Sequence, residues 1–219
     1  MIIQDRFEQW KLGDLLQSYP GLSLRPIING QVRIAGTLSF TASANGFERI
    51  DDAYELEISV PDGFPREFPL VRETAGRIPR NFHTNDDGSL CLGSPARQQL
   101  ALVSAPSLPA FVKSCVIPYL YGFSYREKHG DLPFGELDHG MKGIRKDLAA
   151  LFGVSGEKVA EEMVRLAGMK KRDANKHRCP CGSGRRLGKC HNRQVNRLRS
   201  RLGRPWFREH YRWLTGRAS

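Results

Sequence analysis

The order of the apolar patterns along this 219-residue chain predicts an α+β fold in which an antiparallel sheet is flanked by helices. Residues 32–40 and 54–60 alternate apolar with polar or small residues, which is the period of a half-buried strand. Apolar residues before and after these strands recur every three or four positions, which is the period of an amphipathic helix. Because the strands are grouped and do not alternate with helices, we expect them to pair antiparallel.

The N-terminal half predicts one helix and two strands in that order. The helix is expected between residues 3 and 19, where apolar residues lie at helical spacing until Pro20 and Gly21 end the run. A turn rich in Asn, Gly and Asp then separates the two strands, and residues 61–63 end the second one. Residues 64–71 read as an extended passage that proline stiffens.

Three helices are predicted in the C-terminal half. The segment 108–121 is apolar on more than one side, which predicts a buried helix. The second helix carries apolar residues at positions i, i+4, i+7 and i+8, namely Ile144, Leu148, Leu151 and Phe152. The third places Val159, Met163 and Leu166 on one face, with Ser155 as its expected N-cap and Gly168 as its end.

The positive charge of the chain is concentrated near its C-terminal end. The net charge is +11, and residues 170–219 hold 16 of the 34 Lys and Arg but only two of the 23 acidic residues. Nucleic acid or an acidic protein face would fit this asymmetry, and a solvated basic tail without a specific partner is the other interpretation. No stretch approaches the roughly 20 apolar residues that cross a bilayer, and the first residues do not read as a leader. We therefore expect a cytoplasmic protein that does not contact membranes.

Four residues near the C-terminus have the types and spacing of a metal site. Cys179, Cys181, Cys190 and His191 form the pattern C-x-C-x8-C-H, and three glycines between them allow tight turns. Three thiolates and one imidazole fill the tetrahedral shell of a structural zinc ion and leave no position open for a substrate. Unconnected cysteines in a glycine-rich loop are the alternative. The odd number of cysteines argues against a secreted disulfide framework.

The sequence around these ligands resembles the SEC-C motif, a short zinc-binding module appended to many bacterial proteins. The opening Cys-Pro-Cys-Gly-Ser-Gly and all four ligand positions match over about 25 residues. The resemblance implies a docking element for protein or ribosomal partners. It implies nothing about the rest of the chain.

Residues 81–92 carry the most informative pattern outside the metal site, because an imidazole, an amide and a glycine turn precede the thiol of Cys91. A catalytic cysteine reacts as the thiolate and needs donors that hold a developing oxyanion, which His83 and Asn85 could supply. A core cysteine behind a polar turn is the alternative interpretation. Cys115 lies in an apolar helical run and is expected to be packed.

The first 125 residues or so resemble the ubiquitin-conjugating enzymes. Four features match in order: the N-terminal helix, the strand pair, the passage with Phe64-Pro65 and Phe68-Pro69, and the segment Asp87-Gly88-Ser89-Leu90-Cys91-Leu92. The resemblance implies that Cys91 is the thioester cysteine. One departure is that the His-Pro-Asn triplet of the family reads Asn81-Phe82-His83 here, so that His83 stands where the family has its oxyanion-stabilising asparagine. The tryptophan that follows the cysteine in the family is also missing.

Two histidines lie in glycine-rich polar segments, 123–130 and 133–140, that we expect to be loops. His139 or His129 could accept the proton of an incoming amine beside Cys91. Both could equally be ordinary surface histidines.

Together these patterns predict three regions and one enzymatic function. The regions are a ubiquitin-conjugating-enzyme-like domain at 1–152, a helix and linker at 153–176, and a SEC-C-like zinc module with a basic tail at 177–219. In the expected reaction, Cys91 accepts the C-terminus of a ubiquitin-like or other donor protein as a thioester and passes it to an amine of a target protein. A separate activating enzyme is a possible partner, and bacterial relatives implied by the resemblance occur in antiviral defence operons. The alternative is an inactive binding protein of the same fold that docks through its zinc module and basic tail on a ribosome, a translocase or nucleic acid.

Overall fold

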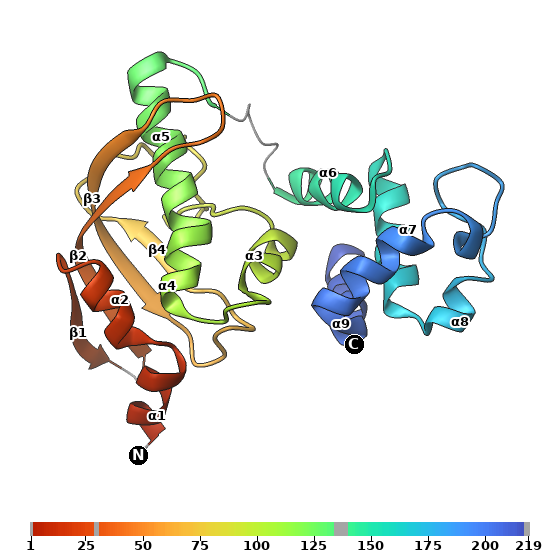
Figure 1. Ribbon diagram of the computed structural model, residues 1–219, viewed down its shortest axis with the longest axis horizontal. Coiled ribbons are helices and arrows are strands. Elements are labelled where there is room, and N and C mark those ends of the chain that lie inside the picture. Colours follow the sequence, from red (N-terminus) through yellow and green to blue (C-terminus); the bar gives the residue numbers. More distant parts are fainter. Residues whose placement is uncertain (1, 29–30, 134–139, 217–219) are drawn as a thin grey trace. The chain divides into compact units, whose positions relative to one another are not determined.

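The computed structural model describes residues 2–28, 31–133 and 140–216, and these divide into two compact units. The first unit comprises Met1–Gly93 and Arg97–Glu136, and the second comprises Ser94–Ala96 and Leu137–Ser219. Figure 1 shows that the first unit holds the sheet and that helices dominate the second. The α+β class predicted from the sequence is confirmed.

The sheet has four antiparallel strands in the order β1-β2-β3-β4. Their bounds are Leu22–Ile28 for β1, Gln31–Ala42 for β2, Ile50–Val60 for β3 and Leu70–Glu73 for β4. The two predicted strands are the central pair, β2 and β3, and β3 ends where the sequence predicted. The edge strands β1 and β4 were not predicted, because neither shows a clear alternation of apolar and polar residues.

Two glycines let β1 approach β2 closely. Leu22 pairs with Gly36, and the Thr37 N–H donates to the Gly21 carbonyl oxygen at 3.0 Å. Gly36 has a φ of 134°, and a Cβ added there would lie only 2.2 Å from the Gly21 oxygen. This position therefore requires glycine.

The single N-terminal helix predicted for residues 3–19 is wrong, because the structure has two short helices, α1 (Ile2–Gln9) and α2 (Leu12–Ser18). Lys11 separates them in a left-handed conformation with φ 54°. Trp10 and Leu12 are 1% and 3% exposed, although residues two positions apart point about 200° apart on a continuous helix. The break is what allows both side chains to enter the core.

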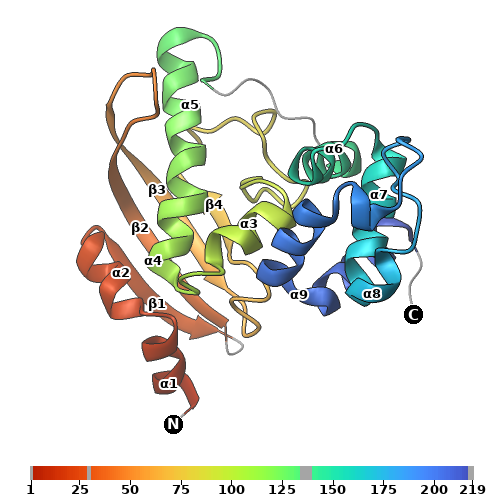
Figure 2. The ribbon, with the colours of Figure 1, turned by 45° about the vertical axis from the view of Figure 1, so that its right-hand side comes forward.

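A long helical segment covers one face of the sheet, as Figures 1 and 2 show. It runs through α4 (Leu108–Phe111), a π-helical turn η1 (Val112–Val116) and α5 (Ile117–His129). The predicted helix 108–121 is thus present but extends further. The loop predicted at 123–130 is wrong, since it is helical up to His129 and ends at Gly130 with φ 83°. A shorter helix, α3 (Pro95–Leu102), precedes this segment.

A polar network ties α5 to the sheet at one point. The Tyr54 hydroxyl on β3 and the Ser124 hydroxyl on α5 lie 2.7 Å apart, and Ser124 also donates to Asp52. Arg77 pairs with both Asp52 and Glu127 at 2.6 to 2.7 Å. Burial raises the pKa of Asp52, but hydrogen bonds from Arg77 and Ser124 outweigh it and lower that pKa to about 2.

The second unit is built from helices around a small core. Its elements are α6 (Gly140–Phe152), α7 (Glu157–Gly168), α8 (Lys171–Ala174), η2 (Leu187–Lys189) and α9 (Asn192–Leu214). Helix α7 starts after Gly156, so the predicted N-cap at Ser155 is wrong. Helix α9 is kinked at Gly203, whose φ of 80° and ψ of 152° are not helical, and Pro205 restarts it.

The predicted ranges and the observed units divide the chain differently. Helix α6 falls in the predicted range 1–152, but its apolar face packs with α7 in the second unit. The predicted helix and linker at 153–176 contains a second helix, α8, whose Ala174 is fully buried. The described part of the second unit therefore includes three helices, α6, α7 and α8, that precede Cys179.

Candidate functional site

The structure brings Cys179, Cys181, Cys190 and His191 together, and their ligand atoms all lie within 4.8 Å of one another. A short backbone pairing positions the first two, because the Cys179 N–H donates to the Arg185 carbonyl oxygen at 2.8 Å. The turn η2 then delivers Cys190 and His191 immediately before α9 starts.

The spacing of these ligand atoms fits a cation with tetrahedral coordination. Cys179 Sγ lies 3.2 Å from His191 Nδ1, Cys190 Sγ lies 3.3 Å from the same nitrogen, and Cys181 Sγ lies 3.6 Å from Cys190 Sγ. An ion with ligand bonds of about 2.0 to 2.3 Å in tetrahedral geometry would hold such atoms about 3.6 to 3.8 Å apart. The cluster is therefore compatible with a closed metal site.

Neighbouring groups orient the four ligands. His191 Nε2 lies 3.3 Å from the Gly153 carbonyl oxygen, a hydrogen bond that places the proton on Nε2 and leaves Nδ1 free to bind an ion. Burial raises the pKa of the Cys179 thiol to about 11, whereas hydrogen bonds from Ser183 lower the pKa of Cys181 to about 6. Cys181 is thus the ligand already suited to bind as a thiolate at neutral pH.

Cys91 lies in a short hairpin that follows β4. Thr84 and Leu90 form an isolated antiparallel bridge, and the Cys91 N–H donates to the His83 carbonyl oxygen at 2.7 Å. The Leu90 N–H donates to the Val71 carbonyl oxygen, also at 2.7 Å, which anchors the hairpin to β4. Cys91 is half-buried, so its thiol is held in place but remains accessible.

The candidate partners of Cys91 differ in where they lie. His83 is its backbone neighbour across the hairpin, with a positive φ of 37° and its ring edge against Phe82 at 4.9 Å. Asn85 lies nearer the tip, where its side-chain amide donates to the Ser89 hydroxyl at 3.0 Å. His139 lies outside the described residues.

His129 takes part in an interaction of its own at the end of α5. Its Nε2 lies 2.7 Å from a Glu48 carboxylate oxygen, and its ring lies 4.2 Å from that of Tyr125. The interaction partner that the structure gives the His129 imidazole is therefore Glu48.

Tyr119 is a candidate that sequence reasoning missed. It comes from α5, and its hydroxyl donates to the Phe82 carbonyl oxygen at 3.0 Å, next to His83. Burial is the main reason that its pKa is raised, and the negative charge of a nearby Cys91 thiolate raises it further. No sequence signal marks Tyr119, because it stands in an apolar helical run far from Cys91 along the chain.

The second cysteine of this unit is buried. Cys115 is 6% exposed, and burial raises the pKa of its thiol to about 11. It remains protonated at neutral pH and is a poor nucleophile.

No protein-family model, curated protein or solved structure matches the chain. Within the described residues, none of the helices combines the length and the apolar character needed to traverse a bilayer.

Proposed function

We propose that the first unit is a ubiquitin-conjugating-like acyltransferase whose nucleophile is Cys91. The observation that carries the proposal is the setting of this thiol. It is half-buried in a hairpin beside the sheet, its backbone N–H donates to the His83 carbonyl oxygen, and the Tyr119 hydroxyl donates to the carbonyl oxygen of the neighbouring Phe82. The order of sheet, cysteine hairpin and covering helix supports the same proposal.

The proposed chemistry is two consecutive acyl transfers. The donor protein arrives with its C-terminus held as a thioester of another thiol. The Cys91 thiolate attacks the carbonyl carbon of this thioester, and the other thiol leaves as a thiolate. An amine of an acceptor protein then attacks the new thioester, Cys91 leaves as a thiolate, and the amine loses a proton to water or a nearby base. We assign the oxyanion that forms at each step to His83, and to the Tyr119 hydroxyl once it gives up its hydrogen bond to the Phe82 carbonyl oxygen.

We further propose that the metal of the second unit is zinc and that its role is structural. Three soft thiolates with one imidazole favour zinc, and a closed shell of four ligands leaves no position for a substrate. The SEC-C-like ligand spacing supports this assignment.

Transfer from a chemical thioester tests the enzymatic proposal without an activating enzyme. Ubiquitin carrying a small-thiol thioester at its C-terminus should form a heavier adduct with the native protein, and reducing agent should release it. Cys91→Ala should form none, Cys91→Ser should form at most a reductant-stable oxyester, and Cys115→Ser should behave as native. An adduct that survives Cys91→Ala would contradict the assignment.

The roles of the assisting residues are tested by a separate measurement. It is the rate at which the Cys91 thioester transfers its acyl group to free lysine. His83→Ala and Tyr119→Phe should still accept the donor but discharge it about a hundredfold more slowly where the lost group stabilises the oxyanion. Asn85→Ala is the matched control, because the Asn85 amide is bonded to Ser89.

One observation favours the alternative of an inactive binding protein. The Asn85 amide donates to the Ser89 hydroxyl within the turn, so this N–H does not serve Cys91. This alternative predicts no adduct on Cys91 with any thioester donor.

A further inference from the structure

The second unit contains a basic hollow of about 490 Å³ between the end of α7 and the second half of α9. Five cationic side chains line it, with a single acidic one: Arg165, Lys170, Arg204, Arg208, Arg212 and Asp173. Arg204, Arg208 and Arg212 are spaced by four residues and therefore form one stripe along α9. The volume lies in the range of pockets that hold small ligands.

Most of this positive charge is not neutralised within the unit. Among the described residues, Lys170, Arg208 and Arg212 form no ion pair, whereas Arg165 pairs with Glu162 at 2.9 Å. Arg204 donates to the Gly168 carbonyl oxygen at 3.3 Å. Like charges held this close repel one another, and an anion between them would remove that cost.

Close packing of the two helices fixes the cations around the hollow. A Cβ added at Gly168 would lie 3.0 Å from Arg208 Cγ, so the absence of a side chain lets α9 approach α7. The hollow is therefore formed by packed backbone. It does not depend on a flexible loop.

The other lining residues indicate what kind of anion fits. Tyr211 is half-buried in the wall beside Met169, and its hydroxyl has no hydrogen-bond partner among the described residues. Guanidinium groups bind phosphate in a bidentate way, and a tyrosine ring offers a surface on which a base can stack. Phosphate binding combined with aromatic stacking is the chemistry of a nucleotide.

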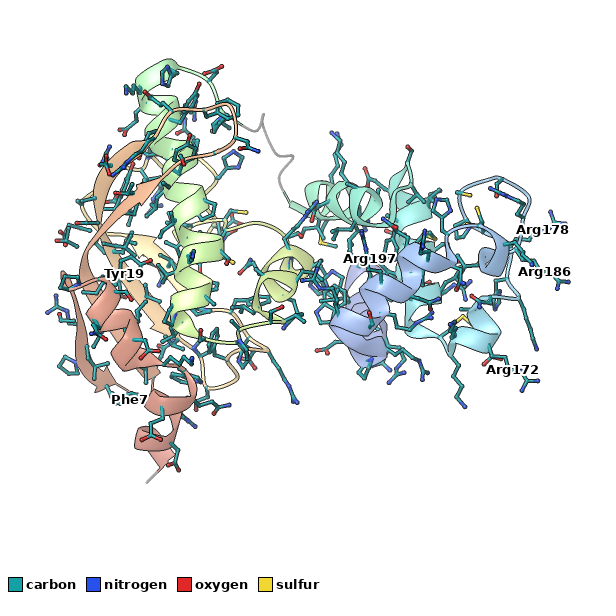
Figure 3. The ribbon with its side chains drawn as sticks, in the orientation of Figure 1. Phe7, Tyr19, Arg172, Arg178, Arg186 and Arg197 are labelled. Carbon is teal, nitrogen blue, oxygen red and sulfur yellow. The ribbon has the colours of Figure 1, made fainter. Side chains whose placement is uncertain are left out.

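We propose that this hollow binds a nucleotide unit of a single-stranded nucleic acid. Arg208, Arg212 and Lys170 would contact its phosphate, and Tyr211 would stack on its base. Arg178 and Arg186 are exposed arginines of the same unit that do not line the hollow, and they extend outward from the turn that carries Cys179 and Cys190 in Figure 3. This proposal is independent of the chemistry of Cys91.

Fluorescence anisotropy with labelled ten-nucleotide oligouridylate and oligothymidylate tests the site in the full-length, metal-loaded protein. Arg208→Gln combined with Arg212→Gln should weaken binding of at least one strand about tenfold or more. It should also make the salt dependence of log Kd shallower by about 1.4, since each lost phosphate contact removes about 0.7. Both residues are exposed and form no ion pair with any residue that the structure describes, so the variant should keep its metal and its circular dichroism spectrum.

Two controls separate the hollow from general attraction to charge. Arg178→Gln combined with Arg186→Gln removes the same charge from the metal-binding turn and should weaken binding less than threefold. Tyr211→Leu should weaken binding about fivefold or more, while Tyr211→Phe, which keeps the ring, should stay within about twofold.

Three outcomes would overturn the proposal. The first is that neither strand binds at low salt. The second is that the two arginine double variants lose the same affinity, because the attraction would then be diffuse. The third is that a ten-residue oligoglutamate competes as well as unlabelled oligonucleotide, because the partner would then be an acidic protein.

Discussion

The two units of this protein differ in the interactions that stabilise them. The first unit buries a continuous apolar core that extends from Trp10 and Leu15 through the sheet to Phe111 and Phe123. The second unit is smaller, and it adds a cluster of three thiols and an imidazole to its apolar contacts. Small domains bury a lower fraction of their surface and often need a metal or disulfides. We therefore predict that burial suffices for the first unit and that the second also depends on a metal bound at its Cys/His cluster.

Metal removal should separate the two units most clearly. Cys179→Ser, or a strong chelator, should lower the metal content and unfold the turn 177–191, because structural metal binding contributes on the order of 10 kcal/mol. The second unit should unfold at a lower temperature while the unfolding temperature of the first stays unchanged. Calorimetry measures the unfolding temperatures, and elemental analysis measures the metal content. Cys91→Ser should keep the metal. A fully ordered second unit without metal would refute this prediction.

Gly36→Ala should destabilise only the first unit, whereas metal removal should destabilise only the second. A side chain at φ 134° that also meets the Gly21 oxygen should cost about 3 kcal/mol or more in urea unfolding. Gly46→Ala is the matched control, since Gly46 also has a positive φ of 82° but nothing lies within 4 Å of its added Cβ. That control should cost only about 1 kcal/mol. Equal losses would show that the close approach of β1 and β2 does not matter.

Acid should weaken the second unit before the first, and His210 is one reason. This residue is 8% exposed, its Nε2 has no hydrogen-bond partner within the described part of the chain, and burial lowers its pKa to about 4. Between pH 6.5 and 4 the unfolded chain binds a proton that the folded chain does not, so stability falls by at most about 3 kcal/mol as pH falls. His210→Phe keeps a ring between Trp206 and Trp213 and should remove this part of the pH dependence in urea titrations. An unchanged pH profile would contradict the assignment.

The first unit should respond to acid later and less. The pKa of Asp52 is lowered to about 2, so the stability that its ionised form contributes is present above about pH 3.8 and is lost as pH falls through 2. The Arg77 side chain of the pair is about a third exposed, so we discount the contribution to about 1 kcal/mol. Asp52→Asn should flatten the unfolding free energy of this unit between pH 4 and 2. A loss that persists in the variant would have to come from other carboxylates.

Local sequence patterns correctly predicted those features of the structure that depend on residues close together in the chain. The central strands follow from the alternation of apolar and polar residues. The four residues of the Cys/His cluster lie within 13 residues, so their spacing alone predicted that they come together. The α+β class followed from the grouping of the strands. These features need no knowledge of how distant segments pack.

Features that depend on tertiary packing were missed. The helix break at Lys11 exists because Trp10 and Leu12 must both reach the core, which no periodicity in residues 3–19 reveals. Tyr119 approaches Cys91 only because α5 crosses the sheet. The hydrogen bond from the Asn85 amide to the Ser89 hydroxyl was also not predicted, although the two residues are only four apart.

The π-helical turn η1 has a consequence for how the length of this chain can change. A π turn holds one residue more than the α-helical turn it replaces, so residues beyond it are rotated by about 100° relative to an uninterrupted helix. This rotation sets the direction in which Tyr119 leaves α5, three residues after the turn. Ser114 is exposed within η1, so deleting it should restore regular helix and leave the flanking α4 and α5 in their present orientation. A deletion at Leu120, beyond the turn, would instead rotate the remainder of α5 away from the sheet. The turn thus marks a place inside a buried helix where losing one residue is expected to be tolerated.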